Sequence, residues 1–464
     1  MGIVLLTCCH FFSGYGLLKL FRLQYKLLVM VPLAMLAGVA IASLMPFILQ
    51  LVYCPLYPGT VFGALTMACI LLNINNFRAL RASPWRWKRL LRGIRIRLYE
   101  IPYILILAFL VWVSVWRCYY LPPTSRDALS GPEAIAEYAV REHTMINSFF
   151  TTELSTTNNQ FKSPFLISLQ VIYKMAGYPF GQVWLSIIFV SFTLLLYQWL
   201  KTAVHPVLGG LLLLLLTITP EMYAYTLMVL YDYSNTVYLF LGLYMLIGYF
   251  DNKRSALFWS ATFFMGIATY IRSETLVLLV LFMPALWIMR RREGTSFLGL
   301  MWWTVLFLLP SVLCYYVTVQ LYNNHYLPVH YDVSAQVNQR LMELGPLFRR
   351  YKDIITELVV SAFGVRLWGY LMFVFAGLLL AELVVMRRLT RAGRNWLYAI
   401  VVVFGGLGLL GHLLPLFSLT DSTKRGLMKV APMMVFYMCN NQLIVRLSHW
   451  IRRWEEASAD DVAR

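Results

Sequence analysis

The sequence predicts an all-α protein that is a polytopic membrane helix bundle. Its 464 residues are 60% hydrophobic and only 13% charged, and the mean hydropathy is +0.67. Soluble domains carry about 25% charged residues, so roughly half of the usual charge is missing. Apolar runs long enough to cross a bilayer recur along the whole chain, with basic residues clustered between them. Because no block of soluble composition interrupts this pattern, we expect a single membrane domain.

About twelve runs are apolar over the ~20 residues that a spanning helix needs. The predicted spans are 27–53, 58–75, 101–121, 183–199, 207–226, 236–250, 255–271, 273–289, 297–320, 365–386, 396–418 and 427–446. Residues 1–16 are apolar but lack the basic start of a signal peptide. We interpret them as a short membrane-associated segment.

The positions of Lys and Arg predict the orientation of these spans. The loop 76–99 is densely basic and is predicted to be cytoplasmic. If the apolar stretch 164–180 crossed the bilayer, the basic loops 251–254, 290–293 and 387–394 would all be external. We therefore predict that 164–180 is an external juxtamembrane or half-depth helix, which leaves the C-terminal tail in the cytoplasm.

The predicted external segments hold most of the polar residues that are not basic. They are the loop 121–163, a turn around Asp232, the tip Arg272–Glu274, the loop 321–363 and the turn 418–426. Transporters tend to place ionisable groups near the bilayer midplane, often in internal repeats, and this sequence has neither pattern. The working surface is therefore predicted to be the non-cytoplasmic side of the membrane.

Charge and cysteine content exclude two other classes of protein. The net charge of +18 follows from the basic loops, and a nucleic-acid-binding face would need a soluble domain to carry it. The seven cysteines show no paired metal-ligand spacing. Cys54 and Cys118 are both near the predicted outer surface, and we predict that they do not form a disulfide.

Asp127 is the first candidate for chemistry. The dipeptide Pro122–Pro123 stiffens the chain between the preceding span and Asp127. A carboxylate held this close to the bilayer is able to act as a general base on a hydroxyl. A solvated Asp127 paired with Arg126 is an equally good interpretation. A helix over about 131–145 follows, with Ser130 predicted as its N-cap.

Other charged side chains accompany Asp127 on the same predicted face. Asp232 lies in VLYDYSN between two apolar spans, where a turn that favours Asp is the alternative interpretation. Arg272 interrupts the apolar stretch 255–289; an Arg so placed is usually paired or functional, with Glu274 as the simplest partner. Further cations stand at predicted helix ends: Lys162, Lys424 and Arg425. Carboxylates and cations on one leaflet suit a lipid phosphate donor and a hydroxyl or amine acceptor.

The order of these motifs resembles the GT-C superfamily of polyprenyl-phosphate-sugar-dependent glycosyltransferases. The nearest branch looks like the protein O-mannosyltransferases and bacterial aminoarabinose transferases. The matching segments, which cover about 101–446, are PPTSRDAL, FKSP, LYDYSN, GIATYIRSETL and STKRGLMKVAP. The resemblance implies that Asp127 is the catalytic base and Asp232 the second acidic residue. It also implies that the donor phosphate is bound by four cations: Lys162, Arg272, Lys424 and Arg425.

The resemblance also implies partners and a location. The donor would be a polyprenyl-phosphate sugar, the acceptor an unidentified glycan, lipid or protein, and the site would face the periplasm from a bacterial inner membrane. No cofactor is implied with certainty. A divalent metal is disfavoured, because Ala128 follows Asp127 where many members carry a Glu. His325 and His330 in the loop 321–363 are candidates for shaping the acceptor site, and an amphipathic cover lying on the headgroups is the alternative.

The predicted organisation has three parts. Residues 1–100 form an N-terminal membrane hairpin with its basic cytoplasmic loop, 101–446 form the GT-C-like domain, and 447–464 form a cytoplasmic tail. Two other functions fit the same fold class. One is a transporter or flippase of a lipid-linked glycan, and the other is a non-catalytic membrane protein that kept the fold.

Overall fold

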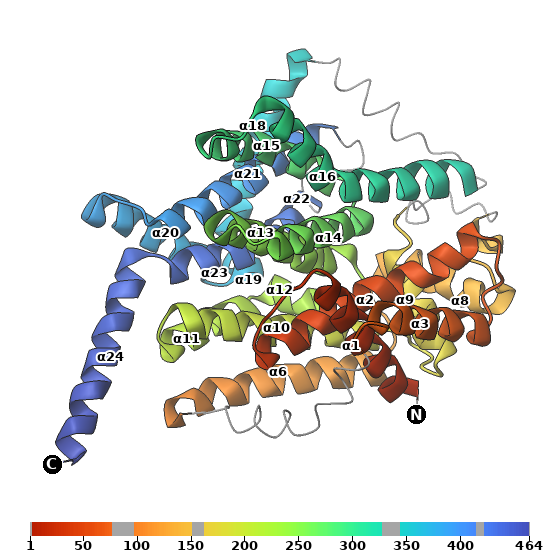
Figure 1. Ribbon diagram of the computed structural model, residues 1–464, viewed down its shortest axis with the longest axis horizontal. Coiled ribbons are helices and arrows are strands. Elements are labelled where there is room, and N and C mark those ends of the chain that lie inside the picture. Colours follow the sequence, from red (N-terminus) through yellow and green to blue (C-terminus); the bar gives the residue numbers. More distant parts are fainter. Residues whose placement is uncertain (1, 77–96, 151–161, 327–343, 414–421, 464) are drawn as a thin grey trace.

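The computed structural model describes residues 2–76, 97–150, 162–326, 344–413 and 422–463. Within these ranges every regular element is a helix and no strand is present, which confirms the predicted all-α class. In Figure 1, α6, α10, α11, α13 and α14 run in the same general direction across the view. The elements α8 and α9 lie at one end of this arrangement, and α24 crosses the opposite end.

The helices occur in four groups along the chain. The first comprises α1 (Gly2–Leu20), α2 (Leu27–Leu51) and α3 (Pro58–Asn73). The second comprises η1 (Leu98–Glu100), α6 (Ile101–Tyr120), α7 (Arg126–Leu129), α8 (Pro132–Glu142), η2 (Ser148–Phe150) and α9 (Phe165–Met175).

The third group comprises α10 (Val183–Ala203), α11 (Pro206–Thr217), α12 (Pro220–Tyr225), α13 (Tyr231–Asn252), α14 (Ser255–Ile271), α15 (Thr275–Arg292), α16 (Phe297–Tyr315) and the π-helix η4 (Tyr316–Tyr326). The fourth comprises α18 (Leu344–Ala362), α19 (Val365–Trp368), α20 (Leu371–Ala381), η5 (Glu382–Met386), α21 (Arg391–Leu413), α22 (Ser422–Gly426), η6 (Leu427–Lys429), α23 (Ala431–Cys439) and α24 (Gln442–Ala463).

Among the described residues, six helical segments are long and apolar enough to cross a membrane: Gly2–Leu20, Leu27–Leu51, Leu98–Tyr120, Val183–Ala203, Phe297–Asn323 and Arg391–Leu413. These segments indicate an integral, multi-pass membrane protein. Other predicted spans fall on shorter apolar helices, such as α11 and α14, so the number of about twelve crossings stays a prediction. The N-terminal segment is longer than expected, because α1 is itself a complete apolar helix.

Glycines allow α1 and α2 to pack with their backbones in contact. An ideal Cβ on Gly38 would lie 1.7 Å from the carbonyl oxygen of His10, and one on Gly14 would lie 1.8 Å from that of Ala34. Small residues at crossing points are the usual means of close helix packing in membranes. The central helices also bind α2, because the hydroxyl of Tyr238 donates to the carbonyl oxygen of Leu36 at 2.7 Å. The helix α2 is thus part of the core of the bundle.

The stretch 164–180 contains one short helix, α9. Its 11 residues extend about 17 Å at 1.5 Å per residue, against a hydrocarbon core of about 30 Å. Residues Phe165–Tyr173 of α9 are buried, and the helix packs on α8 and α2. The length and burial of α9 agree with a half-depth helix enclosed by protein.

Several ion pairs outside the site lie at the end of the bundle that carries the basic loops, which we call the basic end. The pairs there are Lys201–Glu100 at 2.6 Å, Arg97–Glu455 at 2.6 Å, Arg391–Asp251 at 3.6 Å and Lys253–Glu293. All of these residues come from segments predicted to be cytoplasmic. The predicted external charges pair separately, at the candidate site and between α8 and α9.

Candidate functional site

A short turn presents Asp127. The helix α7 is capped by Ser125, whose side-chain oxygen accepts a hydrogen bond from the backbone amide of Ala128 at 3.2 Å. The guanidinium of Arg117, near the end of α6, donates to the carbonyl oxygen of Pro122 at 3.0 Å and so fixes the preceding prolines. The Asp127 carboxylate accepts a hydrogen bond from Nη1 of Arg425, in α22, at 3.1 Å.

Asp232 and Arg272 form a second ion pair. Asp232 lies in the first turn of α13, where a negative charge is favoured by the helix dipole, and its side chain is only 3% exposed. Arg272 directly follows the last residue of α14, and its Nη2 lies 2.8 Å from Oδ1 of Asp232. Asn235 fixes these helix ends, because its Nδ2 donates to the carbonyl oxygen of Ala268 and to Oγ1 of Thr275.

This pair extends into a chain of four alternating charges. Nη1 of Arg272 donates to Oε1 of Glu274 at 2.8 Å, and Nζ of Lys429 lies 3.9 Å from the same oxygen. Burial opposes the charge on Arg272, but the carboxylates of Asp232 and Glu274 outweigh it and raise the pKa of Arg272. Burial likewise opposes the charge on Glu274, and Arg272 and Lys429 reverse this and lower the pKa of Glu274.

A cavity of about 170 Å³ lies beside this chain of charges. Its lining includes Lys162, Arg272 and Glu274, together with two tyrosines and Asn323 of the segment that follows α16. The hydroxyl of Tyr231 donates to the carbonyl oxygen of Ser163 at 2.7 Å, which holds the chain next to Lys162 against α13. The cavity is smaller than the 300–1,000 Å³ typical of ligand pockets, so it suits a headgroup-sized fragment of a larger molecule.

Lys162 connects the two parts of the site. Its Nζ lies 5.9 Å from the centre of the Tyr231 ring. Burial, with a smaller contribution from Arg272, lowers the pKa of Lys162 from 10.5 to about 8, and Asp127 and Asp232 act in the opposite direction. Asp127 and Asp232 therefore both lie within electrostatic range of the Lys162 ammonium group.

The remaining predicted residues lie at the edge of the site or outside the described residues. Nζ of Lys424 is 3.9 Å from Oε1 of Glu357 in the amphipathic helix α18, and Lys424 is not among the residues that line the cavity. The backbone of His325 belongs to η4, and its side chain lies outside what the structure describes. His330 falls in 327–343, which is outside the described residues.

The structure therefore brings together five of the predicted residues: Asp127, Lys162, Asp232, Arg272 and Arg425. The partner of Asp127 is Arg425 and not the neighbouring Arg126, and Arg272 binds both Asp232 and Glu274. Sequence reasoning assigned no role to Lys429. The sequence contained a signal for Lys429, which stands at the start of an apolar run. A lysine at such a position usually has a charged partner.

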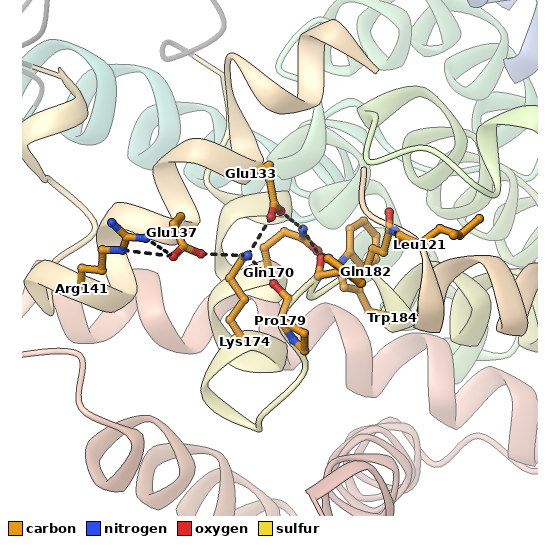
Figure 2. Close-up of polar contacts among 10 residues, drawn as sticks. Leu121, Glu133, Glu137, Arg141, Gln170, Lys174, Pro179, Gln182 and Trp184 are labelled. Atoms are coloured by element: carbon orange, nitrogen blue, oxygen red, sulfur yellow. Dashed lines mark hydrogen bonds and ion pairs between the residues drawn. The ribbon is translucent and has the colours of Figure 1, made fainter. Parts of the chain in front are cut away.

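A second polar network supports the segment that carries Asp127 (Figure 2). Nζ of Lys174, in α9, lies 2.7 Å from Glu133 and 3.1 Å from Glu137, both in α8. Gln170 donates to Glu133 and accepts a hydrogen bond from the indole of Trp184 at 2.8 Å. These contacts join α8 to α9 and α10, and Glu133 lies only six positions after Asp127.

Within the described residues, no group of three or more His, Cys, Asp or Glu side chains is arranged to hold a metal ion. All seven cysteines are free thiols, including Cys54 and Cys118. Comparison of the chain with protein-family models, with curated proteins and with solved structures gives no match. A functional assignment for this chain therefore depends on the residues of the site.

Proposed function

We propose that this protein is a GT-C-type glycosyltransferase that moves a sugar from a polyprenyl-phosphate donor to an acceptor. One observation carries the proposal. Five side chains, from motifs as far apart as Asp127 and Arg425, lie within electrostatic range of one another, and two of them, Lys162 and Arg272, line a cavity. Buried ion pairs contribute little to stability compared with apolar side chains of similar volume, so the pair of Asp232 and Arg272 supports a functional role.

The geometry suggests a role for each group. A donor phosphate that enters the cavity meets the ammonium of Lys162 and the guanidinium of Arg272, which offset the charge that develops as the phosphate leaves. Asp127 takes the proton of the acceptor hydroxyl or amine as that atom bonds to the anomeric carbon. The bond from the anomeric carbon to the phosphate oxygen breaks, and polyprenyl phosphate leaves with the electron pair.

In this scheme Asp232 and Glu274 orient Arg272. Each carboxylate holds one terminal nitrogen of the guanidinium at 2.8 Å, so the plane of Arg272 is fixed before the donor arrives. Preorganised charges of this kind need no rearrangement during the reaction and so contribute strongly to catalysis. We place the protein in a bacterial inner membrane with this end facing the periplasm, since the basic end carries the loops that the positive-inside rule assigns to the cytoplasm.

The proposal is tested with the purified full chain in liposomes. A panel of polyprenyl-phosphate sugars serves as donor, and an envelope extract from a strain that lacks the gene serves as acceptor. We expect one donor to release polyprenyl phosphate and to label the extract. The Asp127→Asn protein should bind that donor but release little, whereas Asp251→Asn, at the basic end, should behave as wild type. Release by Asp127→Asn at the wild-type rate would refute the role of Asp127.

Binding of polyprenyl phosphate gives a second, independent test of the proposal. Polyprenyl phosphate without sugar should bind wild type more tightly than Lys162→Met, because the cavity ammonium is absent from that variant. If the two proteins bind it equally and no donor in the panel is consumed, the glycosyltransferase proposal is wrong. Binding without any consumption, combined with movement of lipid-linked glycan across the liposome bilayer, would instead identify a flippase.

A further inference from the structure

The helix α24 begins after a sharp turn that side-chain hydrogen bonds stabilise. Glu382 is fully buried, and its carboxylate accepts hydrogen bonds from the hydroxyl of Tyr437 at 2.7 Å, from Nδ2 of Asn441 at 2.9 Å and from the backbone amide of Gln442 at 3.1 Å. Oδ1 of Asn441 also accepts from the amide of Leu443 at 2.9 Å. These bonds satisfy amide groups at the start of α24, so the chain changes direction after α23 at little cost.

After this turn α24 runs past the ends of α11 and α6 at the basic end of the bundle (Figure 1). The backbone amide of His205, at the start of α11, donates to Oγ of Ser448 at 2.7 Å. The carboxylate of Glu455 lies 3.1 Å from Nε2 of His205 and 2.6 Å from Nη1 of Arg97, which precedes α6. The side of α24 that carries Ser448 and Glu455 is therefore fixed against the helix ends.

The other two sides of α24 face outward and differ in chemistry. Leu447, Trp450 and Trp454 are spaced by three and four residues, so they share one face, and they are 40%, 64% and 63% exposed. Arg446 and Arg453, seven residues apart, align beside this face, with Arg452 on the polar side, and all three are exposed. An aromatic face flanked by arginines is the pattern of a helix that lies in the plane of a membrane interface.

From these observations we infer that α24 is an interfacial helix that docks on a bilayer surface rich in anionic phospholipid. Leu447 and Trp450 enter the boundary between headgroups and acyl chains, where tryptophan is enriched in membrane proteins. The arginines contact phosphate groups, for which the guanidinium fork is suited. Charge complementarity selects this occupant, because another protein or a second copy would have to match three exposed arginines beside an apolar face. The inference does not depend on the proposed glycosyltransferase activity.

The test uses the full chain in nanodiscs of phosphatidylcholine alone or of phosphatidylcholine with phosphatidylglycerol. Amide hydrogen exchange is followed by mass spectrometry in peptides that cover 446–457. With phosphatidylglycerol we expect exchange to slow by up to about fivefold per arginine near the surface, and high salt should remove the effect. Peptides from α13, in the core, should exchange equally in both discs and show that the fold is intact.

Three variants make the result specific. The triple variant Arg446→Gln, Arg452→Gln, Arg453→Gln should lose the difference between the two lipids. The control Arg291→Gln, Arg292→Gln removes exposed charges at the end of α15 and should keep it. Leu447→Ser, Trp450→Ser should exchange faster in both discs. Equal exchange of wild type in both lipids, or a lipid effect that survives in the triple variant, would overturn the inference. Protection that depends on protein concentration in detergent would show that a second copy covers the face instead.

Discussion

The guanidinium of Arg425 lies 3.1 Å from the carboxylate of Asp127, although 298 positions separate the two residues in the chain. The pair joins the turn that follows α6 to the turn that precedes α23, so it closes the site from two distant parts of the chain. Asp127 and Asp232 then both influence the same ammonium group, that of Lys162.

The first prediction concerns the base. Asn has the volume of Asp but cannot take a proton at neutral pH, so Asp127→Asn should lower sugar transfer by about 10²–10⁴-fold. Donor affinity should change little, because the cavity cations are untouched. Transfer and donor binding are measured on the same purified protein, with Asp251→Asn as the control for loss of an exposed carboxylate. Loss of donor binding in step with transfer would show that Asp127 positions the donor instead.

The second prediction concerns Arg272, and it is checked by measuring both protein stability and use of the donor. Arg272→Ala leaves Asp232 buried without its partner, which should lower the free energy of unfolding by about 3–5 kcal/mol. Adding Asp232→Asn should return much of that stability, as measured by thermal unfolding in detergent, but should not restore donor use. Arg272→Lys should recover part of the donor use, since an ammonium replaces the charge without the fork. Full activity in the double variant would remove Arg272 from the donor site.

The third prediction is a pH dependence set by Lys162. Its pKa of about 8 means that the ammonium is present below pH 8 and is lost as the pH rises above it. Affinity for a polyprenyl-phosphate sugar should therefore be constant below pH 8 and fall by up to about tenfold per pH unit above it. Lys162→Arg should extend the constant range upward, because Arg stays protonated. An identical pH profile in wild type and Lys162→Arg would assign the titration to another group.

The fourth prediction concerns membrane topology. If α9 lies at half depth and does not cross, the loops after it should keep the sides that their charge predicts. A reporter fused after Asn252 should report cytoplasm, and one inserted near Asn158 should report the exterior. The reverse result at both positions would invert the proposed orientation. The same result at both positions would mean that α9 and its neighbours cross after all.

The sequence predicts the contact of Arg272 with Glu274, which the structure confirms, but not the other pairings at the candidate site. Ionisable residues at helix ends are visible as interruptions of apolar runs, which is why Asp127, Asp232 and Arg272 were recognised. Their partners depend on which helix ends meet in the folded bundle. The contact of Lys429 with Glu274 requires η6 to lie beside the start of α15, and no periodicity in the sequence encodes that contact.

The predicted N-cap of α8 was wrong, because the short helix α7 ends at the same residue. The sequence predicted Ser130 as the N-cap of the helix over 131–145, yet α8 begins at Pro132 with Gly131 as its N-cap. Ser130 instead ends α7, with φ −93° and ψ 13°, and its hydroxyl donates to the carbonyl oxygen of Arg126 at 2.8 Å. An N-cap residue needs an extended backbone. The turn that ends α7 gives Ser130 a different backbone conformation, so Ser130 cannot cap α8.

The absence of a side chain at Gly38 affects residues far from α2. An added methyl group would meet the carbonyl oxygen of His10 at 1.7 Å and push α1 outward. The ring of His10 hydrogen-bonds the hydroxyl of Tyr173 at 3.0 Å, and the next residue of α9 is Lys174, which holds α8 through Glu133. A missense change from glycine to alanine in α2 would thus displace α1, and through α9 it would disturb α8. In α8, Glu133 lies six positions after the proposed base. A variant at Gly38 would therefore show a loss of function although the site itself was untouched.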